Sequence, residues 1–377
     1  MLSVEFPVWL RGLGLGLLLT LLLAACAPVD ATPPTATSNT TQTTDAIVVT
    51  DALARTVTLS APPARIVLAG RAVIMLADAI YAFDDIGAKV VAMSDTTQGT
   101  RNFIDLLDPT YGDKTIFSVS DVTAEEIAAA QPDLVIMKRF MASTLEEPLA
   151  QLGIRTLYVD LETPEQYARD LAMLGEVLGQ PARGQELVAR YQREVDNVQA
   201  QLGDLPDDAR PRTLLLYYSD RSGEVAFNVA PTAWIQTRLV EMASGAPVWA
   251  EAAESSGWTV VNFEQIAAWD PDAIFIVHYR GDSQDVVDQL YRDPAWQQLR
   301  AVQSGQLYGF PADFYSWDQP DTRWSLGLHW LASKLHPDRF ANYAIIAEME
   351  RFYQALYGLD AATVTAEILP VLQGSVE

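Results

Sequence analysis

The stretch Pro181 to Leu202, PARGQELVARYQREVDNVQAQL, predicts the long helix around which the rest of the chain is arranged. Its apolar side chains are Leu187, Val188, Tyr191, Val195, Val198 and Leu202. Their spacing places one apolar stripe along one face of an α-helix. Pro181 suits the first helical turn, where its missing N–H leaves no hydrogen bond unmade. At 1.5 Å per residue the helix would be roughly 33 Å long, enough to cross a small domain.

The segments before and after this helix resemble each other. Residues 125–137 read EEIAAAQPDLVIM, and residues 264–277 read EQIAAWDPDAIFIV. With Ile127 aligned to Ile266, each copy predicts a helical turn, a Pro-Asp stop and a buried parallel strand. Two such copies on either side of one helix predict an α/β protein with two Rossmann-like lobes, mostly parallel sheets and a ligand cleft between the lobes.

The domain boundaries follow from this arrangement. The N-terminal lobe is expected over residues 47–180, the linking helix over 181–203 and the C-terminal lobe over 204–377. A chain of 377 residues with 49% hydrophobic content can bury two cores of ordinary size. The formal charge of −24 argues against nucleic acid as a partner, because binding phosphates requires a concentrated basic face.

The first 46 residues predict export and anchoring rather than a fold. An apolar run from Leu13 to Leu23 is too short for a transmembrane helix and has the length of a signal-peptide core. It leads into Leu-Ala-Ala-Cys, which resembles a bacterial lipobox and implies that Cys26 is lipidated after cleavage. The alternative is a buried cysteine in a membrane anchor. Cys26 is the only cysteine, which rules out an intramolecular disulfide.

A tether is predicted after the cysteine. Residues 27–46 are rich in Thr and Pro and have no apolar period, so they are expected to join the anchor to the folded part. The protein is therefore expected in the cell envelope, on the outer face of the bacterial cytoplasmic membrane. That is the periplasmic side wherever an outer membrane exists.

The folded part opens with a predicted edge hairpin, IVVT, a turn over Asp51 to Arg55, and TVTL. The hairpin sequence DALARTVTL, followed by PPARIV, resembles the substrate-binding proteins of ABC importers for iron siderophores, haem and cobalamin, the helix-linked, two-lobed class III. The Pro-Asp strands, the linking helix and the segment Asp293 to Trp296 extend this resemblance to about Phe340. One departure is Ala54, because the family turn usually has glycine there.

Ligands of open α/β sheets bind beyond the carboxyl ends of the strands. Strands are predicted at 65–69, 90–92, 134–137 and 156–159 in the first lobe, and at 213–218, 273–277 and 306–310 in the second. The candidate ligand-binding residues after these strands and in a nearby loop are Arg71, Arg101, Lys138, Arg139, Tyr218, Arg221, His278, Tyr279, Arg280, Tyr315 and Trp317. Guanidinium groups and aromatic faces together predict an anionic ligand.

Each candidate has an ordinary alternative. A single Arg is more often a solvated surface group, and roughly half of the set is expected outside the cleft. Tyr315 and Trp317 suit core packing equally well, although the resemblance implies that their loop faces the ligand. The three histidines, His278, His329 and His336, form no cluster. No metal site or cofactor is therefore expected, and iron would arrive already chelated.

The resemblance also implies a protein partner. In related importers one exposed Glu on each lobe meets arginines of the permease, and alignment of the motifs places these at Glu125 and Glu241. The alternative is a pair of ordinary helix carboxylates, with Glu126 competing for the first position. The expected partners are the ABC permease with its ATPase subunits, a small anionic ligand and the membrane, with the protein itself a monomer.

Enzyme signatures do not occur in the sequence: it has no Gly-x-Ser-x-Gly elbow, P-loop or His-Glu-x-x-His motif. The resemblance implies that the protein captures a ferric siderophore, haem or cobalamin and delivers it to the permease, and that it is not an enzyme. The alternative is a molybdate or tungstate carrier of the same fold. A lipid-anchored hydrolase and a structural lipoprotein are the remaining hypotheses. One helix joining the lobes favours modest closure.

Overall fold

The computed structural model describes residues 46–95, 98, 101–119, 121–220, 223–253 and 257–376. Residues 44–377 form one compact unit. The predicted signal peptide, Cys26, almost all of the tether and Arg221 lie outside the described residues. Within these ranges the chain forms no helix with the length and apolar character that crossing a membrane requires.

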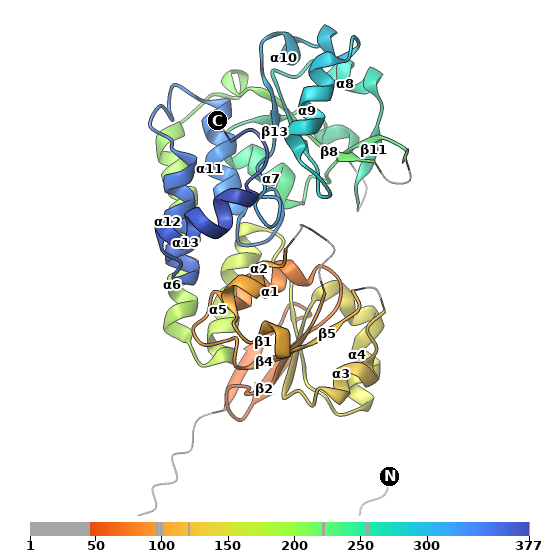
Figure 1. The fold of residues 1–377 in the computed structure, drawn as a ribbon, viewed down its shortest axis with the longest axis vertical. Coiled ribbons are helices and arrows are strands. Elements are labelled where there is room, and N and C mark those ends of the chain that lie inside the picture. The colour runs from red at the N-terminus through yellow and green to blue at the C-terminus, as the bar shows by residue number, and fades with distance from the viewer. Residues whose placement is uncertain are drawn as a thin grey trace, which may run out of the picture. The chain divides into compact units, whose positions relative to one another are not determined.

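The predicted long helix is confirmed as α6, Pro181–Leu202, and it follows α5, Pro164–Leu178. Thr163 caps α5, and Gly179 ends it at a φ of 74°. The two helices pack closely because a glycine of each faces the other: a Cβ on Gly175 would lie 2.9 Å from the Cα of Gly184. In Figure 1, α6 runs along one side of the molecule from the N-terminal to the C-terminal sheet.

The N-terminal sheet contains only parallel strands, in the order β5-β4-β3-β6-β7. Its strands are β3 (Ile66–Leu68), β4 (Val90–Ser94), β5 (Thr115–Phe117), β6 (Leu134–Lys138) and β7 (Thr156–Val159). The helices between them are α1 (Val73–Tyr81), α2 (Phe103–Leu107), α3 (Ala124–Ala129) and α4 (Ala142–Gln151). Only β5 was absent from the predicted strands, because its three residues carry too short a pattern.

The predicted edge hairpin is β1, Ile47–Thr50, paired antiparallel with β2, Thr56–Leu59. The carboxylate of Asp51 accepts the backbone N–H groups of Leu53 and Arg55, at 2.9 and 3.0 Å. Ala54 has a φ of 60°, the left-handed region that glycine adopts without strain. The turn therefore has the glycine-type geometry although the chain has alanine there.

The C-terminal sheet is mixed and has the order β11-β9-β8-β12-β13, with β10 beside β8. Its strands are β8 (Arg212–Ser219), β9 (Ala226–Val229), β10 (Ala246–Pro247), β11 (Thr259–Val261), β12 (Ala273–Val277) and β13 (Leu307–Gly309). The helices are α7 (Ile235–Met242), α8 (Phe263–Trp269), α9 (Ser283–Arg292) and α10 (Arg300–Gln303). The antiparallel pairs β8-β9 and β9-β11 were not predicted.

The C-terminal helices return to the first lobe. They are α11 (Trp324–Leu335), α12 (Ile345–Tyr357) and α13 (Ala361–Thr363), and Figure 1 shows α11 and α12 alongside α6. Arg183 of α6 donates to the carbonyl of Leu356 at 2.8 Å. The ring of Tyr357 packs against Phe103 of α2 with centroids 4.9 Å apart. The chain therefore crosses between the lobes at α6 and ties them together again through α12. The lobe boundaries at residues 180 and 203 stay a prediction.

The two Pro-Asp repeats fold alike. Thr123 and Asn262 each begin their helix with a capping box. Asp133 accepts the N–H of Arg65 at 2.9 Å, and Asp272 accepts the N–H of Arg212 at 2.7 Å. The guanidinium groups of these two arginines also donate to carbonyls at the end of the helix in each repeat. Arg65 binds Ala130 after α3, and Arg212 binds Trp269 of α8, each at 2.6 Å. The repeated sequence therefore forms the same connection between helix and strand in both lobes, which we call the joint.

Candidate functional site

A pocket of about 320 Å³ lies at the carboxyl ends of β12 and β13. We call it the cleft pocket. Its wall comes from three segments: Gln98 of the first lobe, His278 to Gly281 after β12, and Ala312 to Ser316 after β13, with Val371 and Gln373 at the side. The segments after these strands are where the rule for open sheets places ligands. Four predicted ligand residues, His278, Tyr279, Arg280 and Tyr315, meet there.

One hydrogen-bonded pair of amides joins the lobes at this pocket. Gln98 follows β4, and Gln319 belongs to the segment before α11. Each side-chain amide donates to the oxygen of the other, both at 2.8 Å. Because both partners are neutral, the pair closes the cleft without adding charge to it.

His278 is the most unusual group in the pocket wall. Its side chain is 11% exposed, and within the described part of the chain neither ring nitrogen has a hydrogen-bond partner. The ring is held edge-on to Tyr218 at 5.1 Å between centroids. Gly281 packs against it so closely that a Cβ there would lie 2.7 Å from Cε1. The imidazole is therefore fixed in place beside the pocket by packing rather than by hydrogen bonds.

Aromatic rings gather behind the C-terminal half of the cleft. Tyr217 packs against Tyr279 at 4.7 Å and against Trp258 at 5.0 Å, and Trp258 meets Trp234 at 5.6 Å. The hydroxyl of Tyr279 donates to Asp318 at 2.7 Å. Burial raises the pKa of Tyr279 well above its usual value, so this hydroxyl stays protonated. Trp234, directly before α7, and Trp258, directly before β11, were not among the candidates, because neither follows a predicted strand.

Cations follow the carboxyl ends of β3 and β6 in the N-terminal lobe. Arg139 is exposed and lies 3.9 Å from Asp160, beside a separate pocket of about 450 Å³ that includes Phe140 and Glu162. Arg71 is also exposed, and its guanidinium lies 5.6 Å from the centre of the Phe140 ring. The exposed Phe140 ring beside Arg71 offers an apolar surface for the flat part of a ligand.

Three predicted ligand residues are engaged within the protein. Lys138 is buried, and its ammonium binds Glu162 at 2.7 Å and the carbonyls of Asp160 and Leu161. Burial lowers the pKa of Lys138, and Glu162 opposes that effect. Trp317 is wholly buried and donates to Asp313 at 3.0 Å. Arg101 is exposed but forms an ion pair with Glu367 at 3.1 Å.

Tyr315 is buried although it lies in the wall of the cleft pocket. Its hydroxyl accepts the N–H of Phe103 and donates to Asn102, both at 3.3 Å. The core-packing alternative therefore describes Trp317, and Tyr315 combines packing with a place at the pocket. Sequence pattern alone could not separate these cases, because both residues follow the same strand. The ligand-binding roles of all the candidate residues stay predictions.

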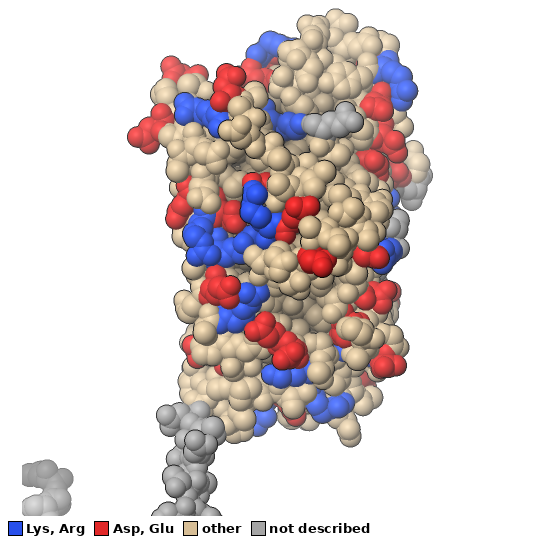
Figure 2. All heavy atoms as spheres, turned by 60° about the vertical axis from the view of Figure 1, so that its left-hand side comes forward, with Lys and Arg blue, Asp and Glu red and all other residues tan. Residues whose placement is uncertain are grey.

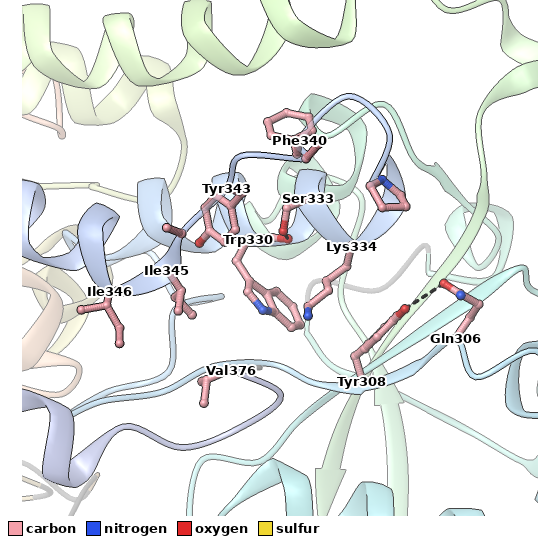
Figure 3. Close-up of a pocket in the computed structure, with 13 residues that line it drawn as sticks. Gln306, Tyr308, Trp330, Ser333, Lys334, Phe340, Tyr343, Ile345, Ile346 and Val376 are labelled. Carbon is pink, nitrogen blue, oxygen red and sulfur yellow. Dashed lines mark hydrogen bonds between the residues drawn. The ribbon is translucent and has the colours of Figure 1, made fainter.

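A second pocket, of about 640 Å³, lies elsewhere in the C-terminal lobe. Figure 3 shows Trp330 and Lys334 of α11 and Tyr308 of β13 pointing toward one another, with Tyr343 and Ile345 on the side of Trp330. The ammonium of Lys334 lies 5.5 Å from the centre of the Tyr308 ring. Because Gln306, which precedes β13, lines it, this pocket lies toward the amino end of the strand. It is therefore not at the strand ends where the two lobes face each other.

The predicted docking glutamates occupy unlike positions. Glu125 is exposed in the first turn of α3, and the neighbouring Glu126 is engaged in the capping box with Thr123. The docking role of Glu125 stays a prediction. Glu264 holds the same position in α8, directly before the capping residue Gln265, and it is also exposed. Glu241 lies near the end of α7 and pairs with Arg238 at 2.8 Å. The structural counterpart of Glu125 is thus Glu264.

Charges on the face that carries α6 and α12 are mixed. Figure 2 shows basic side chains gathered about half-way up this face with acidic side chains beside them. Pairs within these helices include Arg183 with Glu186 at 2.9 Å and Arg190 with Glu194 at 3.3 Å. These cations therefore each have a carboxylate partner on the same helix.

Comparison with known proteins identifies the class. Residues 66–314 match the family model described as periplasmic binding protein. The chain is 23% identical over 260 residues to the molybdate-binding protein MolA of Haemophilus influenzae, covering 63% of this chain and 71% of the relative. It is 24% identical over 253 residues to the Fe(3+) dicitrate-binding periplasmic protein FecB of Escherichia coli, covering 67% and 78%.

Solved structures show the same fold. A periplasmic solute binding protein from Veillonella parvula superposes with a TM-score of 0.69 at 22% identity, over 87% of this chain and 98% of that one. The molybdate complex of MolA from Haemophilus influenzae gives 0.67 at 21% identity, over 83% and 98%. The chain belongs to the periplasmic binding protein family, whose members are the extracytoplasmic solute-binding components of ABC importers. The predicted two-lobed α/β fold and the predicted class are confirmed.

Proposed function

We propose that this protein captures a compact, anionic metal chelate in the cleft and delivers it to an ABC permease. The observation that carries the proposal is the contrast between the two halves of the cleft. Exposed guanidinium groups, Arg71 and Arg139, stand on the first lobe, and an aromatic wall with His278 and Arg280 stands on the second. Carboxylates of a chelate suit the first half, and its flat or apolar parts suit the second.

The size of the cleft pocket favours a chelate of modest size. Its 320 Å³ lies near the lower end of the range for small-molecule sites, about 300 to 1,000 Å³. A macrocycle such as haem would require more room than this form of the cleft offers. Two relatives are named for ferric citrate complexes, FecB and the Fe(3+)-citrate-binding protein YfmC of Bacillus subtilis, which is 23% identical over 79% of this chain. Ferric citrate is therefore the first ligand to test.

Molybdate or tungstate is the second candidate, because MolA is among the relatives. A bare oxyanion would need several donors converging at hydrogen-bond distance, about 3 Å, in a small closed site. The cleft pocket instead combines one exposed arginine, Arg280, with aromatic side chains, amides and the carboxylate of Asp313. The aromatic side chains can pack against the apolar parts of a chelate, which a bare oxyanion lacks, so this arrangement favours the chelate.

A ligand screen separates the candidates. The purified protein is heated with ferric citrate, ferric siderophores, haem, cobalamin, molybdate or tungstate, and a ligand that binds only the folded state raises the Tm. Ferric citrate is expected to raise it, and Arg139→Ala is expected to reduce the rise. Arg155→Ala is the matched control, because Arg155 is exposed just before β7, at the amino edge of the same sheet. A rise with molybdate alone would replace the chelate by the oxyanion.

The proposal includes the anchor and the partners. Cys26 is lipidated, residues 27–46 tether the lobes to the outer face of the cytoplasmic membrane, and the protein works as a monomer that turns over no substrate. Cys26→Ser is expected to move the protein from the membrane fraction to the soluble fraction. On the permease side, Glu125 and Glu264 form the docking pair, since both are exposed at the same place in the two repeats.

A further inference from the structure

Arg323, at the residue before α11, is wholly buried together with three carboxylates. Its guanidinium binds Asp78 of α1, donates to Asp313 at 2.6 Å through Nε, and lies 3.5 Å from Asp321. The rings of Phe103 and Tyr315 lie 4.5 and 5.1 Å from its centre. This cluster, which we call the buried seam, joins the two lobes because Asp78 belongs to the first lobe and Arg323 to the second.

The buried seam is unbalanced in charge. One guanidinium faces three carboxylates, and buried charges without partners are costly. Within the described residues Asp78 Oδ1, Asp321 Oδ2 and Arg323 Nη2 have no hydrogen-bond partner. Burial, opposed by Arg323, raises the pKa of Asp78 to about 6 and that of Asp321 well above its usual value. A proton held among these carboxylates therefore reduces the excess negative charge.

The groups facing Asp78 come from every element packed around it. Beyond Arg323, Asp313 and Asp321 they are the phenols of Tyr167 on α5, Tyr191 on α6, Tyr315 in the pocket loop, and Tyr357 on α12. Burial raises the pKa of all four phenols. They stay neutral at physiological pH, so Asp78 and Asp321, whose pKa values are raised, are the groups of the seam that we expect to change charge.

The same seam reaches the ligand pocket through Asp313. This carboxylate accepts hydrogen bonds from Arg323, from the indole of Trp317 at 3.0 Å and from the hydroxyl of Tyr353 on α12. Asp313 also begins the run Asp313 to Ser316, all four residues of which line the cleft pocket. The conformation of the pocket loop is therefore set by bonds whose other end is Asp78 in the opposite lobe.

We infer that Asp78 and Arg323 are positioning residues for the ligand. Through Asp313 they hold the pocket loop, Ala312 to Ser316, in its receptive conformation, and a proton shared by the carboxylates of the seam tightens that hold. The inference takes one thing from the proposed function, namely that the cleft binds a ligand. The contact between the lobes and the loop is a property of the protein by itself.

The indole N–H of Trp317 reports on the seam without any ligand. Its signal in ¹⁵N NMR can be assigned with the variant Trp317→Phe. In the unaltered protein this signal is expected to shift with pH, with a midpoint at about pH 6. Asp78→Asn keeps the shape of the side chain and removes the titrating carboxylate, so the midpoint is expected to disappear or to move by about one pH unit or more. A signal that titrates identically in both proteins would overturn the inference.

Hydrogen exchange tests the hold on the loop. Amides of residues 312–319 are expected to exchange about tenfold faster in Asp78→Asn, while those of β6 and β12 keep their rates. Glu367→Gln is the matched control, because it removes an exposed ion pair with Arg101 and should leave the loop unchanged. Equal acceleration throughout the protein would mean a merely structural role and would overturn the inference.

A milder variant covers the case in which Asp78→Asn does not fold. Tyr353→Phe removes only the hydroxyl that binds Asp313, so faster exchange is expected in residues 312–319 alone. Unchanged exchange there would count against the inference. Neither readout involves a ligand, so a failed ligand screen would contradict the proposed function without deciding this inference.

Discussion

The two Pro-Asp repeats are alike at one end of the molecule's sheets and different at the other. At the amino ends, Arg65 with Asp133 and Arg212 with Asp272 form the same joint between helix and strand. At the carboxyl ends, the first lobe presents exposed arginines and the second an aromatic wall. The contacts at the amino ends therefore maintain the same scaffold in both lobes, while the residues after each strand can differ and so determine what is bound.

The largest effect is expected from a substitution that breaks the contact between the two lobes. Arg323→Met removes the single cation that faces the three buried carboxylates, and leaving buried charge unpaired costs about 3 to 5 kcal/mol. Urea unfolding at neutral pH measures this loss in the free energy of unfolding. Arg300→Met is the control, because Arg300 pairs with Asp270 on the surface and should cost under about 1 kcal/mol. Equal losses in the two variants would contradict the account of the seam.

The next effect is a pH dependence. The folded-state pKa of Asp78 is raised to about 6 from 3.8, so the native state holds its proton more tightly than the unfolded chain. Its contribution is present below about pH 4 and is lost as the pH rises to about 6, by up to roughly 3 kcal/mol.

Other carboxylates complicate the total profile, because Glu194 and Asp108 have lowered pKa values and act in the opposite sense. The measurement is therefore the difference in unfolding free energy between the unaltered protein and Asp78→Asn across about pH 4 to 7. A difference that is flat over this window would show that Asp78 does not titrate there.

A matched pair of substitutions sharpens the comparison of the repeats. Asp133→Ala and Asp272→Ala each remove the acceptor of a strand N–H, and each is expected to cost about 1 to 2 kcal/mol in urea unfolding. Asp272 also pairs with Arg300 on the surface, a contact worth under about 1 kcal/mol, so the two losses should agree within about 1 kcal/mol. If one substitution leaves the free energy of unfolding unchanged while the other lowers it strongly, the two joints contribute unequally to stability.

At the carboxyl ends the effect falls on binding. Arg139→Ala and Arg280→Ala are each expected to weaken ferric citrate about tenfold, near 1.4 kcal/mol, by removing a charged donor. Isothermal titration calorimetry measures the Kd, and Arg155→Ala should leave it unchanged. Since these arginines are exposed, stability should stay within about 0.5 kcal/mol of the unaltered protein.

The smallest effect on the protein itself is expected at the docking positions. Glu125→Gln and Glu264→Gln should leave folding and ligand affinity unchanged and should slow uptake of radiolabelled iron by cells, most strongly when combined. Glu241→Gln is the control, since Glu241 lies on α7 outside the repeat. A stronger defect from Glu241 than from Glu264 would restore the pair that the sequence alignment predicted.

The sequence by itself determined the elements whose signals are local. The long helix α6 and the hairpin β1-β2 have the predicted bounds, and the strand of each Pro-Asp repeat lies where it was predicted. These elements are specified by apolar periodicity, turn residues and caps, all of which lie within a few residues of one another. The class of protein followed from the same local motifs.

Tertiary structure alone decided which of the strand-end residues reach a cleft. Lys138 and Trp317 were predicted as ligand residues from the sequence, but in the structure their side chains bind Glu162 and Asp313 inside the protein. Arg323 is wholly buried against Asp78, 245 positions away in the chain. The physical reason is that burial and pairing of charge depend on contacts between distant segments, which no local periodicity records.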